Sequence, residues 1–137
     1  MGSRHASRKL AMQVLYQAET RSEDVKEFLK LFVDDSEFSD DVKEFGEQLA
    51  VATWECRESL DKFVEQFAIG WSLDRISLLD LSILRLAFYE LNKTDLSAKI
   101  ILNEAVELAK EFSSDDSPKF INGILGKFVE SDVYRNR

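Results

Sequence analysis

Apolar residues recur every three or four positions along most of the chain, and this spacing is typical of helices that bury one face. Segments in which apolar and polar residues alternate are almost missing, which argues against β-strands. One proline and five glycines among 137 residues leave the helical pattern largely uninterrupted. The pattern therefore predicts a nearly all-helical protein.

The first predicted helix carries a continuous apolar stripe, and the basic residues of the N-terminus fall in its first turns. The stripe consists of Leu10, Ala11, Val14, Leu15 and Ala18. A second, short helix is predicted over residues 25–32, where apolar residues again share one face. The acidic stretch 34–39 has no helical period and is predicted to be a loop.

One long helix is predicted from residue 39 to about residue 68. Ser39 can cap free amides at its start, and Asp40 and Asp41 suit the positive end of a helix dipole. Gly70 is expected just beyond its end. Its apolar positions are Val42, Phe45, Leu49, Ala52, Cys56, Leu60, Phe63 and Phe67.

Three further helices are predicted in the remainder of the chain. Residues 77–80 (SLLD) have the form of a capping box, and the helix that follows is apolar on most sides, as expected for a central helix. Ser97 is predicted to start the next helix. Pro118 suits the first turn of the last helix, after a cap by Asp116 or Ser117.

The size and composition of the chain suit one domain, or two small halves that share a core, because 45% of its 137 residues are hydrophobic. No uninterrupted run of about 18 apolar residues occurs, and the N-terminus lacks the apolar centre of a signal peptide. These features predict no membrane contact and a cytoplasmic location. The single cysteine, Cys56, is expected to be a buried structural thiol.

Charge is distributed unevenly along the sequence. The formal net charge is −8, yet the first 18 residues contain three Arg or Lys residues and no Asp or Glu. Residues 19–47 contain eleven acidic residues against four basic ones. An acidic surface repels polyanions, so a nucleic acid could be bound only by a local basic patch.

The sequence contains no group of residues with the spacing of a catalytic or metal site. One histidine and one cysteine cannot form a zinc site, and no cofactor is predicted. Asp115 and Asp116 are better explained as helix-capping residues than as an acid/base pair. Neither a glycine-rich phosphate loop nor a Gly-x-Ser-x-Gly elbow occurs. A binding protein is therefore favoured over an enzyme.

Five side chains have both a structural and a functional interpretation. Asp80 and Arg85 lie in an apolar helix, where the first can cap and the second can pair with it or reach water. Tyr16 alone is best explained as a residue at the edge of the core. Lys119 and Phe120 could hold a phosphate and stack a base near a helix N-terminus, although a lone phenylalanine is more often core.

Three stretches resemble the NusB family of bacterial transcription antitermination factors. They are RKLAMQVLYQ at residues 8–17, ILRLAFYEL at 83–91, and ILNEAVELAKEFSSDDSPKFINGIL at 101–125. The third stretch is the most specific because it is a long, ordered match. With the order of helices between them, the resemblance covers essentially the whole chain.

The resemblance implies an all-α fold of about six to seven helices in two packed three-helix subdomains, roughly residues 1–68 and 69–137. It also implies binding to the boxA element of single-stranded leader RNA, as a heterodimer with the ribosomal protein NusE. Such a complex joins RNA polymerase and other Nus factors in the transcription of ribosomal RNA operons. Self-association to a homodimer is a further expectation from the family.

The resemblance implies RNA contacts by Arg4, His5, Arg8, Lys9, Tyr16, Arg85, Lys119 and Phe120. It implies partner contacts by Asp80 and Asp116. The four basic residues at positions 4, 5, 8 and 9, here called the N-terminal basic group, are interrupted where family members usually have a denser arginine cluster. We therefore expect weak RNA binding by the chain alone, and a second, basic protein would lengthen the charged track.

Two other functions compete with this interpretation. One is a protein-interaction adaptor, in which the N-terminal basic group is simply a solvated helix end. The other is an accessory domain like those fused to ribosomal RNA cytosine methyltransferases, but the sequence contains no glycine-rich cofactor motif. An antitermination factor without enzymatic activity is the favoured prediction.

Overall fold

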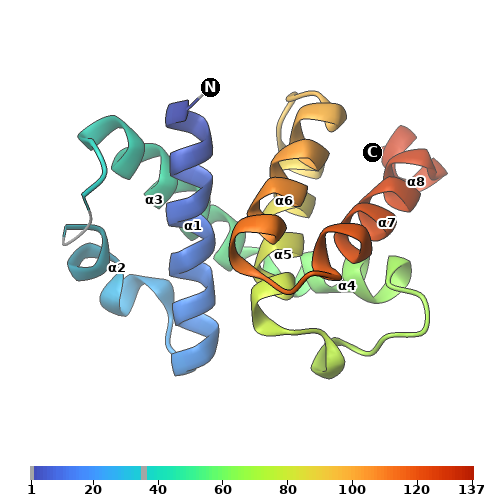
Figure 1. Ribbon diagram of the computed structural model, residues 1–137, viewed down its shortest axis with the longest axis horizontal. Helices are drawn as coiled ribbons and strands as arrows, with labels where there is room; N and C mark the ends of the chain where they lie inside the picture. Colours follow the sequence, from blue (N-terminus) through green and yellow to red (C-terminus); the bar gives the residue numbers. More distant parts are fainter. Residues whose placement is uncertain (1, 35–36) are drawn as a thin grey trace. The chain divides into compact units, whose positions relative to one another are not determined.

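The computed structural model describes residues 2–34 and 37–137, and all regular structure in these residues is helical. The chain forms two compact units that divide between Cys56 and Arg57, ahead of the division expected after residue 68. The elements are α1 (Gly2–Arg21), α2 (Val25–Asp34), α3 (Asp40–Glu55), α4 (Arg57–Phe67), a 3-10 turn (Leu73–Arg75), α5 (Leu78–Lys93), α6 (Ala98–Phe112), α7 (Ser117–Glu130) and α8 (Asp132–Arg135) (Figure 1). The all-α prediction is confirmed.

The first unit contains α1, α2 and α3, and α1 packs against both of the others. All five residues of the predicted α1 stripe are at most 1% exposed. The hydroxyl of Ser7 on α1 donates to the carbonyl oxygen of Val42 on α3 over 3.0 Å. A Cβ added at Gly46 would lie only 2.9 Å from the Ser7 carbonyl oxygen, so this glycine allows the two helices to approach closely.

The start of α3 is confirmed, whereas the single long helix from residue 39 to residue 68 is wrong. Ser39 accepts a hydrogen bond from the Val42 amide, as a capping serine should. The helix ends at Cys56, whose backbone has φ −107° and ψ 19° and whose amide donates to Trp54. The Cys56 thiol instead donates to the Ala52 carbonyl over 3.3 Å, the acceptor that a continuing helix would give to its amide.

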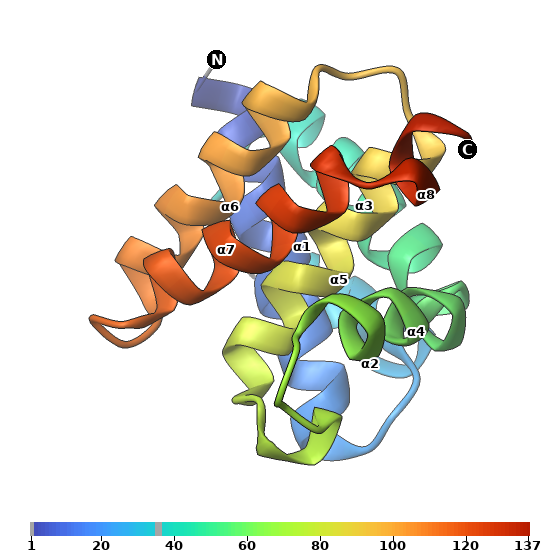
Figure 2. The same cartoon turned by 90° about the vertical axis from the view of Figure 1, so that its right-hand side faces the viewer.

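The second unit contains α4 to α8 and the 3-10 turn, with α5 at its centre. Eleven residues of α5 are buried, which confirms the prediction of a central helix. Three phenylalanines and a tyrosine pack ring to ring around Phe128, namely Phe63, Phe67, Phe88 and Tyr134. Helices α6 and α7 lie side by side and are joined by a tight turn (Figure 2).

Four other expectations concern Gly70, Cys56, the loop after residue 34 and membrane-spanning helices. Gly70, just after α4, has a left-handed φ of 85°, as predicted for a residue that follows a helix. Cys56 is half-buried rather than buried, because it lies at a helix end. The expected loop begins after α2 ends at Asp34, but residues 35 and 36 lie outside the described part of the chain. No described helix has the length and apolar character needed to cross a membrane.

Candidate functional site

The N-terminal basic group lies on the first three turns of α1, and its members differ in exposure. Arg4 is exposed, His5 and Lys9 are half-buried, and Arg8 is only 5% exposed. The accessible part of the group is therefore formed by Arg4, with smaller contributions from His5 and Lys9, while Arg8 is placed in the interior.

Arg4 is held against a ring from α3. Its guanidinium carbon lies 3.6 Å from the centroid of the Phe45 ring, within the range of a cation–π contact. A cavity of about 360 Å³ lies beside this contact and is lined by Arg4, Ser7, Asp41, Glu44, Phe45 and Gln48. Phe45 was predicted only as part of an apolar stripe, and its pairing with Arg4 could not be recognised from periodicity.

Tyr16 lies further along α1 and is half-buried. It follows Lys9 by seven residues, which places the two side chains on the same helix face about two turns apart. The structure thus places Tyr16 beyond the basic turns, on the face of Lys9.

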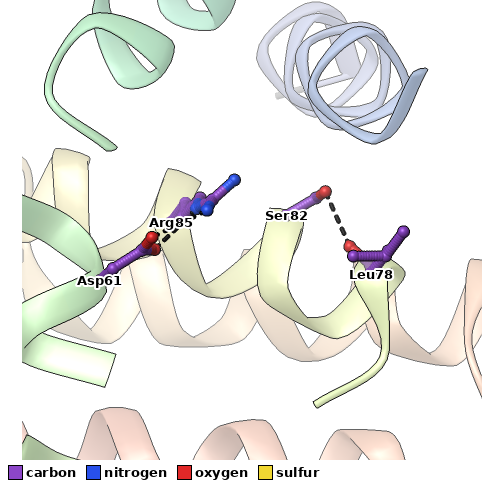
Figure 3. A network of polar contacts seen from close by, with 4 residues as sticks. All are labelled: Asp61, Leu78, Ser82 and Arg85. Atoms are coloured by element: carbon purple, nitrogen blue, oxygen red, sulfur yellow. Dashed lines mark hydrogen bonds and ion pairs between the residues drawn. The ribbon is translucent and has the colours of Figure 1, made fainter. Parts of the chain in front are cut away.

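Arg85 is bound to a carboxylate inside the second unit. Its Nε donates to Asp61 Oδ1 over 2.7 Å and its Nη2 donates to Asp61 Oδ2 over 2.8 Å, a two-pronged ion pair (Figure 3). The Arg85 side chain is 7% exposed and that of Asp61 is 18% exposed. The pairing with Asp80 that was considered from the sequence is therefore wrong, because α4 supplies a closer carboxylate.

Asp80 has a different set of partners. Its carboxylate accepts hydrogen bonds from Ser113 over 2.7 Å and from Ser117 over 3.0 Å, and the residue is 7% exposed. Ser77 accepts from the Asp80 amide over 3.1 Å, so only the serine half of the predicted capping box forms. Asp80 thus ties the start of α5 to the turn between α6 and α7.

A second cavity, here called the aromatic pocket, has a volume of about 530 Å³ and lies beside that same turn. The rings of Trp71 and Phe120 line it, with centroids 5.2 Å apart and planes inclined at 63°. Trp71 is 46% exposed, whereas Phe120 is half-buried. Sequence reasoning missed Trp71, although a large aromatic residue directly after Gly70 in a polar turn was a usable signal.

Polar and charged residues surround the aromatic pocket. Arg75 and Asp116 line it and are exposed, and the exposed Lys119 precedes Phe120 on α7. Asp116 is the N-cap residue of α7, as predicted, but its side chain makes no capping hydrogen bond. No group of three or more His, Cys, Asp or Glu side chains suited to a metal ion occurs among the described residues.

The model of the NusB family matches residues 5–130 of this chain. The chain therefore belongs to the NusB family. It is 39% identical over 128 residues to the transcription antitermination protein NusB of Acetivibrio thermocellus, covering 93% of this chain and 88% of that protein. It is 42% identical over 130 residues to the NusB of Thermobifida fusca, covering 94% of this chain and 90% of that protein.

Solved NusB structures share the fold over the whole chain. NusB of T. maritima superposes with a TM-score of 0.82 at 27% identity, covering 98% of this chain and 97% of that one. A crystal structure of the antitermination factors NusB and NusE in complex with dsRNA gives a TM-score of 0.84 at 26% identity, covering 100% and 99%. The NusB relatives carry the name of a transcription antitermination protein, which is a non-enzymatic role.

Proposed function

We propose that this NusB-family chain is a non-enzymatic transcription antitermination factor that binds the boxA element of single-stranded leader RNA together with NusE. Residues 1–137 would act as one NusB-like domain within the RNA polymerase complex of ribosomal RNA operons, in the cytoplasm. One observation carries the proposal: the entire chain superposes on a NusB that was crystallised with NusE and double-stranded RNA.

The N-terminal basic group supplies the phosphate contacts in this proposal. Arg4 is its most exposed member, and His5, Lys9 and Tyr16 continue along α1. A few cations release few counterions from RNA, so the affinity of the chain alone is expected to be modest at physiological salt. Arg8 contributes mainly by holding this part of α1 in place, because it is buried.

The aromatic pocket supplies a contact for an unpaired base in this proposal. Phe120 and Trp71 are inclined to each other rather than stacked, which leaves ring surface uncovered. Single-stranded RNA is commonly bound by stacking bases on such rings, with cations nearby for the phosphates. Lys119 and Arg75 provide those cations. Arg85 is proposed to act on RNA binding only through the fold, because Asp61 occupies its guanidinium.

The acidic surface of the chain supports a basic protein partner such as NusE. The net charge is −8 even though the N-terminus is basic, so most of the surface complements a basic protein. Asp116 is an exposed carboxylate that could contact this partner directly. Asp80 would affect the partner contact indirectly, by holding the α6–α7 turn, since its oxygens already accept hydrogen bonds from Ser113 and Ser117. A homodimer is a storage form compatible with this proposal.

An electrophoretic titration of a boxA oligonucleotide with and without NusE tests the proposed function. We expect NusE to tighten binding by at least about tenfold, and we expect a scrambled oligonucleotide to bind more weakly. The R4A/K9A double variant should weaken binding to boxA without changing thermal unfolding appreciably. Equal affinity for boxA and scrambled RNA would refute specific recognition. NusE binding without any RNA binding would support the adaptor function instead.

A further inference from the structure

The Arg4 guanidinium lies over the Phe45 ring in a cation–π contact. The guanidinium carbon lies over the ring, 3.6 Å from its centroid, and a guanidinium that stacks face to face on a ring keeps its N–H donors in its own plane, away from that ring. Among the described residues, Arg4 forms no ion pair, although Asp41 and Glu44 line the same cavity. The ring therefore contacts a cation that has no ion-pair partner among the described residues.

The backbone of α3 at Phe45 is held by the close packing of α1 on α3. Gly46, the next residue on α3, lies so near α1 that an added Cβ would be 2.9 Å from the Ser7 carbonyl oxygen. The hydrogen bond from Ser7 to Val42 holds the same turns together over 3.0 Å. Residue 45 is thus carried by a part of α3 that packs closely against the first turns of α1.

We propose that Phe45 is a positioning residue, which holds the Arg4 guanidinium so that it can bind an RNA phosphate. This inference rests on the proposed RNA-binding function and names a residue that acts through Arg4. A free arginine side chain samples many rotamers and loses that freedom when it binds a phosphate. The ring restricts this sampling before RNA arrives, and it does so without occupying the donors that a phosphate needs.

A double-mutant cycle on RNA binding separates this role from a structural one. The boxA dissociation constant is measured with saturating NusE for the wild type, F45L, R4A and the F45L/R4A double variant. We expect F45L alone to weaken binding about two- to fivefold, which matches the strength of an exposed cation–π contact. In the R4A background, F45L should have no further effect, because the group that the ring positions is gone.

Two controls keep the cycle interpretable. F45W retains an aromatic face and should restore wild-type affinity, whereas F38L removes another half-buried ring of the same unit and should leave RNA affinity unchanged. The slope of log affinity against log salt should fall by about one for R4A, as expected when one phosphate contact is lost. Thermal unfolding of each variant reports any loss of fold.

Three other outcomes would each contradict the inference for a different reason. If F45L weakens binding equally in both backgrounds, Phe45 acts through the fold or touches RNA itself. If R4A has no effect while the wild type binds boxA, Arg4 lies off the RNA path, and the inference fails while the proposed function stands. If the wild type with NusE does not bind boxA, the proposed function and the inference fail together.

Discussion

Arg4 in the first unit and Arg85 in the second are both predicted RNA contacts, but their surroundings differ. Arg4 is exposed, lies over an aromatic ring and forms no ion pair among the described residues. Arg85 is 6% exposed and gives two of its donors to Asp61. The comparison teaches that the neighbours of a guanidinium, more than its place in a family motif, decide whether its donors remain available to a ligand.

Removing the partner of Arg85 is expected to have the largest effect. D61A should lower the free energy of unfolding by about 2–4 kcal/mol, because it leaves a nearly buried guanidinium without its carboxylate. Chemical denaturation monitored by circular dichroism measures this loss. The exposed Lys26–Glu55 ion pair, 3.1 Å long, provides the control, and E55A should cost less than about 1 kcal/mol. Equal losses of unfolding free energy in D61A and E55A would show that the Asp61–Arg85 pair stabilises the fold no more than an exposed ion pair does.

Disturbing the surface that carries Arg4 is expected to have the next largest effect. G46A should destabilise the protein by about 1–2 kcal/mol, because its Cβ would overlap the Ser7 carbonyl and force α1 away from α3. G46A should also weaken RNA binding, because the shift of α3 would displace the adjacent Phe45 from Arg4. G123A is the matched control, since an added Cβ there meets no atom within 4 Å. G123A should be neutral or stabilising, because alanine has a better helix propensity than glycine. A stabilising effect of G46A would contradict the close approach of α1 and α3.

Removing the exposed ring of the aromatic pocket is expected to change RNA binding with little change in stability. W71A should weaken boxA binding about tenfold, within the range for loss of one base–ring stack. The salt dependence should stay nearly constant, because no phosphate contact is removed. I69A, which removes a side chain that is 70% exposed on the same segment, is the control. Unchanged boxA affinity in W71A would show that this pocket does not contact the RNA.

Most helices could be predicted from the sequence because their signals are local. The α1 stripe and the serine caps at Ser39 and Ser77 involve residues within a few positions of one another, and all are present in the structure. The break at Cys56 was missed because the apolar period continues across it. The backbone angles of Cys56 and the hydrogen bonds of its amide and thiol reveal the end of α3.

The candidate site was less predictable because its contacts join distant parts of the sequence. Asp61 pairs with a residue 24 positions away, and its sequence neighbours make it resemble an ordinary surface carboxylate. Phe45 was indistinguishable from a core residue without knowing which side chain faces it. The resemblance to the NusB family named Arg4 and Arg85 together, and only their packing distinguishes them.

The central claim is that Arg4, held by Phe45, contacts an RNA phosphate. The most direct measurement is the salt dependence of boxA binding with saturating NusE, compared between the wild type, R4A and K62A. K62A removes an exposed cation of α4 that has no proposed role. We predict that R4A lowers the slope of log affinity against log salt by about one and that K62A leaves it unchanged. An unchanged slope in R4A, or an equal fall in both variants, would contradict the claim.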